Sequence, residues 1–80
     1  MTKIETRILR VIRDLEIIEV RKVRFDADLR REMKVDSLNM VALLTSIEHE
    51  FTTVFEDNVF EGIKTLDEAV TILMRDPKLI

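Results

Sequence analysis

Glycine and proline are almost absent from this chain of 80 residues, which contains one of each. Tight hairpin turns depend on residues such as glycine that tolerate a positive φ, so a sheet of strands joined by hairpins is disfavoured. Apolar residues recur instead at every third or fourth position, which is the spacing of one face of a helix. The sequence therefore predicts an all-α fold.

Four helical segments are expected, around residues 4–15, 37–51, 56–62 and 65–75. Residues 17–35 show some alternation of apolar and charged residues, but one short strand without a partner is not a stable unit. We predict a long ordered loop there, held by the side chains of Val20, Val23, Phe25 and Leu29. The whole chain (1–80) is expected to be one domain, a small four-helix bundle with a long first loop and a short third helix.

Capping residues mark three of the helix ends. Asp36 is a good N-cap, which places Ser37 at the first position of the second helix. Thr65 and Glu68 have the spacing of a capping box at the start of the last helix. Gly62 is suited to form the C-terminal cap of the short third helix.

The net charge of −3 conceals a strong asymmetry along the chain. Residues 20–35 carry six basic and three acidic residues, whereas residues 36–62 carry six acids and no lysine or arginine. A surface of one sign attracts partners of the other sign, so a basic protein partner is implied, with a solvated charged face as the alternative. The basic stretch contains acids of its own and a single aromatic residue, Phe25, so we expect no nucleic-acid partner.

Most catalytic and metal-binding arrangements lack their residues in this sequence. There is no cysteine, His49 is the only histidine, and no glycine-rich loop precedes a helix. We therefore expect neither a metal site nor an enzyme. No apolar run approaches the roughly 20 residues that span a bilayer, and no signal-peptide pattern opens the chain, so a cytoplasmic protein is expected.

Ser37 is either an ordinary helix-start residue or a point of covalent attachment. On a helical wheel it lies beside the apolar residues Leu38, Val41 and Ala42, opposite the buried face. Exposed apolar residues beside a polar group suggest a docking surface. The N-terminus of a helix also favours an anion, so a phosphate ester on this serine is permitted, though not required.

The stretch "EMKVDSLNMVALLTSIEHEF" resembles the signature of acyl carrier proteins, in which an Asp-Ser-Leu triplet opens the second helix. Upstream, Leu29, Glu32 and Met33 match the family's pattern of an apolar residue, an acid and an aliphatic residue. Downstream, "FEGIKTLDEAVTIL" is similar to the family's third and fourth helices. The resemblance covers essentially the whole chain.

This resemblance implies that a phosphopantetheinyl transferase attaches 4′-phosphopantetheine from coenzyme A to Ser37, with Asp36 and Leu38 beside it. A monomer would then present acyl thioesters to the acyl-transferring and condensing enzymes of fatty-acid, polyketide or related biosynthesis. The residues implied in partner recognition are Asp36, Leu38, Asn39, Val41, Ala42 and Glu48. Those implied in an acyl pocket, for which plain core packing is the alternative, are Leu43, Ile47, Phe55, Phe60, Ile63, Ala69 and Ile72.

Four positions depart from the family pattern. Lys34 stands where the family usually has glycine, and Asn39 and Ala42 replace two acids of the recognition helix. Because surface charges govern encounter rates and partner choice, we hypothesise a specialised pathway. Phe60 replaces a small residue, so we expect long saturated acyl chains to be poorly sheltered.

Two other functions remain open at this point. A peptidyl or aminoacyl carrier of a non-ribosomal pathway would use the same serine chemistry, but such domains usually show a glycine pair before the motif and lie within longer chains. A helical adaptor, in which Ser37 is only a helix-start residue, predicts no modification at all.

Overall fold

The computed structural model describes residues 2–77, which form helices and loops and contain no strand. The all-α prediction is therefore confirmed for this part of the chain. The elements are α1 (Lys3–Leu15), the single 3₁₀ turn η1 (Val20–Lys22), α2 (Ser37–Phe51), α3 (Asp57–Gly62) and α4 (Leu66–Met74).

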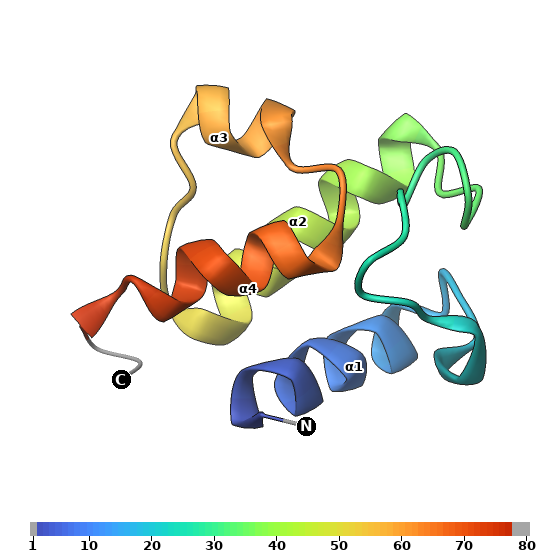
Figure 1. Ribbon diagram of the computed structural model, residues 1–80, viewed down its shortest axis with the longest axis horizontal. Coiled ribbons are helices and arrows are strands. Elements are labelled where there is room, and N and C mark those ends of the chain that lie inside the picture. The colour runs from blue at the N-terminus through green and yellow to red at the C-terminus, as the bar shows by residue number, and fades with distance from the viewer. Residues whose placement is uncertain (1, 78–80) are drawn as a thin grey trace.

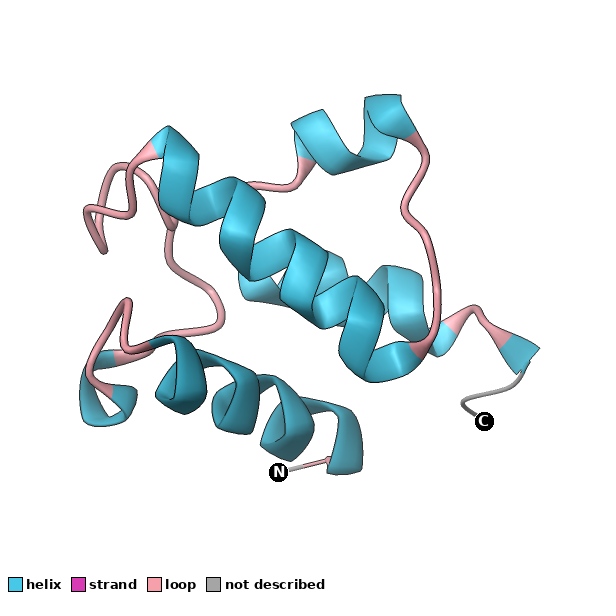
Figure 2. Ribbon diagram, turned by 180° about the vertical axis from the view of Figure 1, so that it is seen from behind, coloured by secondary structure: helices cyan, strands magenta, loops and turns pink. Residues whose placement is uncertain are grey.

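The three longer helices pack together, and the short helix α3 lies on the opposite side from α1 (Figures 1 and 2). Helices α2 and α4 lie one behind the other in both views, and α1 runs below this pair in both. The long first loop, which includes η1, closes the end of the bundle where α2 begins. Both the loop and the start of α2 thus lie at one end of the molecule.

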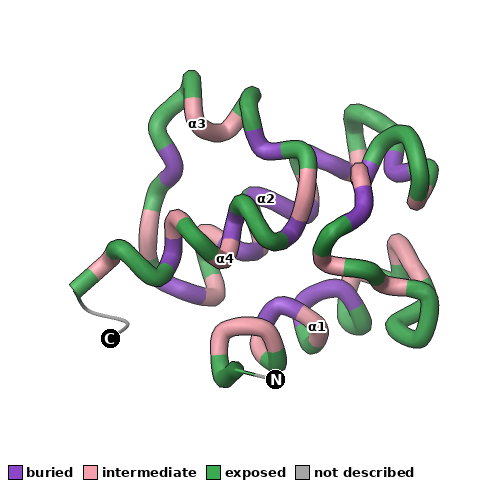
Figure 3. The backbone as a smooth tube through the Cα atoms, in the orientation of Figure 1, coloured by how far each residue is buried: buried purple, intermediate pink, exposed green. Residues whose placement is uncertain are grey.

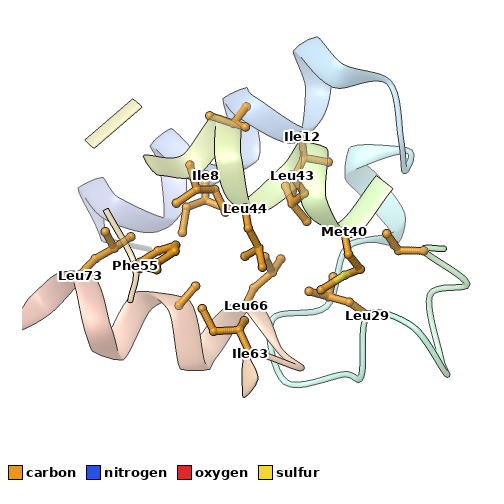
Figure 4. Close-up of a cluster of buried hydrophobic side chains, with 14 of the residues drawn as sticks. Ile8, Ile12, Leu29, Met40, Leu43, Leu44, Phe55, Ile63, Leu66 and Leu73 are labelled. Carbon is orange, nitrogen blue, oxygen red and sulfur yellow. The ribbon is translucent and has the colours of Figure 1, made fainter. Parts of the chain in front are cut away.

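One continuous apolar core joins these helices (Figures 3 and 4). The apolar residues that recur at helical spacing along α2 form one buried stripe, as predicted. Its members are Met40, Leu43, Leu44, Ile47 and Phe51. Helices α1 and α4 face this stripe, and the loop adds Leu29 to it. The largest fully buried side chains are Ile8, Ile12, Leu29, Leu43, Leu44, Ile47, Leu66 and Leu73.

Capping boxes fix the starts of α1 and α4. Oγ1 of Thr65 accepts a hydrogen bond from the Glu68 nitrogen at 3.2 Å, and Oε1 of Glu68 accepts one from the Thr65 nitrogen at 3.1 Å, as predicted. The expectation that Gly62 forms the C-cap of α3 is wrong, because the C-cap is Ile63. This residue is the last of α3 and has no positive φ, because α3 ends through a hydrogen bond from the Ile63 nitrogen to the Val59 carbonyl at 3.2 Å.

Two backbone hydrogen bonds anchor the long loop to the connection between α3 and α4. The Leu29 nitrogen donates to the Lys64 carbonyl at 2.9 Å. The Asp67 nitrogen, at the open start of α4, donates to the Phe25 carbonyl at 3.0 Å. These bonds satisfy polar groups that the loop and the helix start would otherwise leave unpaired.

Side chains complete the anchoring of the loop, although not all of the predicted ones take part. Leu29 is fully buried, and Val23 and Phe25 are half-buried against the core, as expected. The prediction for Val20 is wrong, because this residue lies in η1 and is 39% exposed. The loop residue Ala27, which was not among the predicted anchors, is buried.

An arginine joins α1 to the last turn of α2. Nε of Arg7 lies 2.7 Å from Oε2 of Glu50, and Nη2 donates to the Glu50 carbonyl at 2.7 Å. The same guanidinium lies 4.3 Å from the ring centroid of Phe51, within cation–π distance. No pattern in the sequence had indicated this contact.

Candidate functional site

Ser37 occupies the first position of α2, as predicted. Asp36 has an extended backbone, and its Oδ1 atom accepts a hydrogen bond from the Asn39 nitrogen at 2.8 Å, which makes it the N-cap. Ser37 is exposed, and its hydroxyl has no hydrogen-bond partner among the described residues. A hydroxyl that is open to solvent and engaged in no internal bond is chemically accessible.

Two exposed apolar side chains follow this serine on α2. Leu38 is 79% exposed and Val41 51% exposed. Asn39 and Ala42, the two uncharged residues that depart from the family pattern in this helix, are half-buried. The face beside Ser37 is thus apolar and carries no charged side chain between Asp36 and Glu48. Such a surface suits contact with another protein.

Glu48 has a role within the chain that the sequence did not reveal. Its Oε2 atom accepts a hydrogen bond from the Phe55 nitrogen at 2.6 Å, across the connection between α2 and α3. The side chain is half-buried. The carboxylate therefore helps to hold this connection against the end of α2.

The seven residues predicted for an acyl pocket all belong to one apolar cluster. Five of them are buried, and the ring of Phe60 and the side chain of Ile72 are half-buried against that core. Figure 4 shows Leu43, Phe55 and Ile63 directed into the same interior. The structure brings these side chains together, and core packing alone accounts for their burial.

Lys34 adopts a left-handed backbone conformation, with φ of 60°. Glycine adopts this region freely, whereas a residue with a Cβ atom pays roughly 1 kcal/mol or more. The next residue, Val35, is buried and its nitrogen donates to the Leu29 carbonyl at 2.9 Å. The bend at Lys34 therefore turns the chain from the loop anchor at Leu29 into the cap of α2.

A compact turn precedes this bend. Oδ1 of Asp28 accepts hydrogen bonds from the nitrogens of Arg30 at 3.0 Å and Arg31 at 2.9 Å. Oε2 of Glu32 accepts one from the Asp28 nitrogen at 2.7 Å. The bond from the Arg31 N–H, together with that from Arg30, holds the pKa of the Asp28 carboxyl below its ordinary value. The acid at position 32, singled out in the sequence, thus stabilises the turn.

Comparison with known proteins identifies the family. A family model described as "Phosphopantetheine attachment site" matches residues 6–73 of the chain. The chain is 35% identical over 75 residues to an acyl carrier protein of Petrotoga mobilis, which covers 91% of this chain and 88% of the relative. The chain belongs to the acyl carrier protein family. It carries acyl groups on a phosphopantetheine arm.

Other acyl carrier proteins are similar over the same length. The chain is 32% identical over 73 residues to acyl carrier protein 2 of Pseudomonas aeruginosa, covering 91% of this chain and 92% of the relative. It is 30% identical over 71 residues to an acyl carrier protein of Coprothermobacter proteolyticus, covering 89% and 87%. These names favour an acyl carrier over a non-ribosomal carrier, and the family match argues against a simple adaptor.

No helix within residues 2–77 has both the length and the apolar character needed to cross a membrane. Groups of three or more side chains that could together hold a metal ion are also missing from this part of the chain.

Proposed function

We propose that Ser37 is the residue to which the phosphopantetheine arm is attached. The observation that carries this proposal is the exposed, unbonded hydroxyl at the first position of α2, directly after the N-cap Asp36. A phosphodiester on this oxygen would lie at the positive end of the helix dipole. Because the chain has no cysteine, the thiol that forms the acyl thioester is supplied by the arm.

The partners in this proposal are a phosphopantetheinyl transferase and the acyl-transferring and condensing enzymes of a biosynthetic pathway. They would dock on the start and outer face of α2, through Asp36, Leu38, Asn39, Val41, Ala42 and Glu48. The exposed Leu38 and Val41 support a docking surface in which apolar contact contributes more than charge. Asn39 and Ala42, which replace two acids that are usual in the family, support a specialised pathway.

The acyl chain would be sheltered by the cluster that contains Leu43, Ile47, Phe55 and Ile63, with Phe60 limiting its depth. The bond-making steps belong to the partner enzymes, so we propose no catalytic residue in this chain. We further propose that residues 1–80 act as one domain, as a monomer, in the cytoplasm, where coenzyme A is available as the donor of the arm.

An intact-mass measurement tests the central proposal. The protein is incubated with coenzyme A and a promiscuous phosphopantetheinyl transferase, with Ser37→Ala and Ser46→Ala in parallel. Ser46 is a half-buried serine of the same helix and serves as the matched control. We expect one phosphopantetheine adduct on the wild type and on Ser46→Ala, and none on Ser37→Ala. A folded protein that gains no adduct while a known carrier is modified would overturn the proposal.

A further inference from the structure

Lys34 is a lysine at a bend that glycine would form more easily. Three described residues other than glycine have a positive φ, namely Glu16, Lys34 and Thr52. Glu16 and Thr52 are the C-caps of α1 and α2, where a left-handed residue commonly ends a helix. Lys34 ends no helix, and its Cβ atom makes this conformation less favourable than it is for glycine. A side chain kept at such a position is a reason to look for its function.

The ammonium group of Lys34 has no partner within the described part of the chain. The side chain is exposed, and it takes part in no ion pair or side-chain hydrogen bond among residues 2–77. The two nearest acids in the sequence are both engaged elsewhere. Glu32 accepts a hydrogen bond from the Asp28 nitrogen at 2.7 Å in the preceding turn, and Asp36 accepts one from the Asn39 nitrogen at 2.8 Å as the N-cap of α2. The charge of Lys34 is therefore available to a further anion.

The backbone path brings this charge to the start of α2. Val35 is buried, and its nitrogen donates to the Leu29 carbonyl at 2.9 Å, whereas Lys34, Asp36 and Ser37 are exposed. Three peptide units separate Lys34 from Ser37, so their Cα atoms lie at most about 11 Å apart. Both residues belong to the end of the molecule where the long loop meets α2 (Figure 1). The flexible four-carbon stem of lysine lets its ammonium group reach a group attached to the serine.

A phosphodiester on Ser37 adds negative charge to a helix start that is already negative. Asp36 supplies a carboxylate there, and residues 36–62 contain six acids and no lysine or arginine. Lys34 is the basic residue nearest to Ser37 in the sequence, and the next one, Arg31, is six positions away from the serine. Because attraction between opposite charges grows as their distance falls, Lys34 is the cation best placed to offset this negative charge.

We propose that Lys34 binds the phosphodiester through which the arm is attached to Ser37, and so holds the root of the arm on the loop side of α2. The inference rests on the proposed function, in which Ser37 carries the arm. A lysine ammonium group binds phosphate oxygens as a point charge with three N–H donors. The glycine that is usual in the family at position 34 offers no such ligand. The thiol end of the arm stays free to move between partner enzymes.

The test compares the protein before and after the arm is attached. Wild-type protein is incubated with coenzyme A and a promiscuous phosphopantetheinyl transferase, and intact mass establishes the adduct, with Ser37→Ala as the unmodified control. The side-chain ammonium signals of the lysines are then recorded by ¹⁵N NMR at low ionic strength. We expect the Nζ signal of Lys34 to shift between the two forms, and that of Lys64, another exposed lysine, to stay unchanged.

Two matched variants separate this contact from charge in general. Lys34→Gln removes the charge but keeps the Cβ atom, so the strain of the bend is retained, and Lys64→Gln removes the same charge from the connection between α3 and α4. The ³¹P signal of the modified protein should move in Lys34→Gln and stay in place in Lys64→Gln. Added sodium chloride should move the wild-type signal toward that of Lys34→Gln, because salt screens an exposed charge pair. Attachment of the arm should lose about two- to five-fold in kcat/KM in Lys34→Gln, and Lys34→Arg should restore it.

The outcomes distinguish this inference from the proposed function. A folded wild type that gains no adduct would overturn both. An adduct whose ³¹P signal is the same in wild type and Lys34→Gln, or moves equally in Lys64→Gln, would overturn the role of Lys34 and leave Ser37 as the attachment site. A slower attachment in Lys34→Gln without any change in the ³¹P signal would also count against the contact, because it would assign Lys34 to the transferase interface.

Discussion

The carboxylate of Glu48 and the backbone nitrogen of Phe55 are joined by a hydrogen bond of 2.6 Å that closes the connection between α2 and α3. In the sequence, Glu48 is an acid on the helix that partners are expected to contact. In the fold, it satisfies a backbone donor next to the buried ring of Phe55. Its contribution to folding can be separated from any contribution to docking.

Replacing Glu48 by alanine should lower the free energy of unfolding by about 1–2 kcal/mol, because a partly buried backbone donor loses its charged acceptor. Glu48→Gln keeps an acceptor oxygen and should cost less than half of this amount. Urea denaturation of the two variants measures the difference. Equal and small losses would show that the bond to Phe55 contributes little to stability.

Lys34→Gly should stabilise the protein by about 0.5–1 kcal/mol, because glycine adopts the left-handed conformation without the Cβ penalty, although it also gains freedom in the unfolded chain. Lys34→Ala removes the charge but keeps the Cβ atom, and should change stability by less than about 0.5 kcal/mol. Thermal and urea unfolding of both variants provide the measurement. A loss of stability in the glycine variant would contradict the assignment of strain to this bend.

The turn at Asp28 should make the free energy of unfolding depend on pH. The pKa of this carboxyl is lowered in the folded protein, so its contribution is fully present above the ordinary carboxyl pKa of about 4 and disappears as the pH falls through the folded value. Asp28→Asn keeps an acceptor for the Arg30 and Arg31 nitrogens but cannot titrate. The stability gap between wild type and variant, from urea unfolding at several pH values, should therefore narrow below about pH 4. Asp14→Asn on α1 controls for net charge, and a gap that stays constant would refute the prediction.

Restoring acids on α2 should redirect partner choice. Asn39→Asp together with Ala42→Glu recreates the charges that the family usually has, and should raise turnover with a housekeeping fatty-acid synthase several-fold through faster encounter. The increase should shrink at high salt. Thr45→Glu, on the same face but one turn further along, is the control for added charge alone. Unchanged turnover would remove the argument for a specialised pathway.

Phe60 should restrict the length of the cargo. Its half-buried ring fills space against the core, so a C4 thioester on the arm should be hydrolysed more slowly than a C12 thioester. Phe60→Ala should extend protection to C12, at a cost in stability that urea unfolding can quantify. Hydrolysis rates of the two thioesters on wild type and variant provide the comparison, and equal protection of C4 and C12 in the wild type would contradict a shortened pocket.

The helices and their caps were predictable because their signals are local. The stripe of α2, the N-cap at Asp36 and the capping box at Thr65 each depend on residues within a few positions of one another. Contacts between distant segments have no such signal. Arg7 and Glu50 are 43 positions apart, and either could have been an ordinary surface charge.

The same distinction applies to the candidate site. The triplet around Ser37 was recognisable in the sequence. The hydrogen bond from the Phe55 nitrogen to Glu48 was not, because it depends on the path by which the chain after α2 comes back to that helix. The surface hollow lined by Arg31 and Lys64 was not predictable either, because its lining comes from residues 28–31 and 61–64, which are distant in the sequence.

The loop is fastened to the rest of the fold through main-chain atoms, at Leu29 and Lys64 and at Phe25 and Asp67. An anchor of this kind is indifferent to most side-chain replacements, since every residue except proline offers the same N–H and carbonyl groups. The outward side chains of the loop are therefore free to diverge while its path is kept. A carrier built in this way can acquire a new cargo or a new partner by surface substitutions alone, without having to redesign its scaffold.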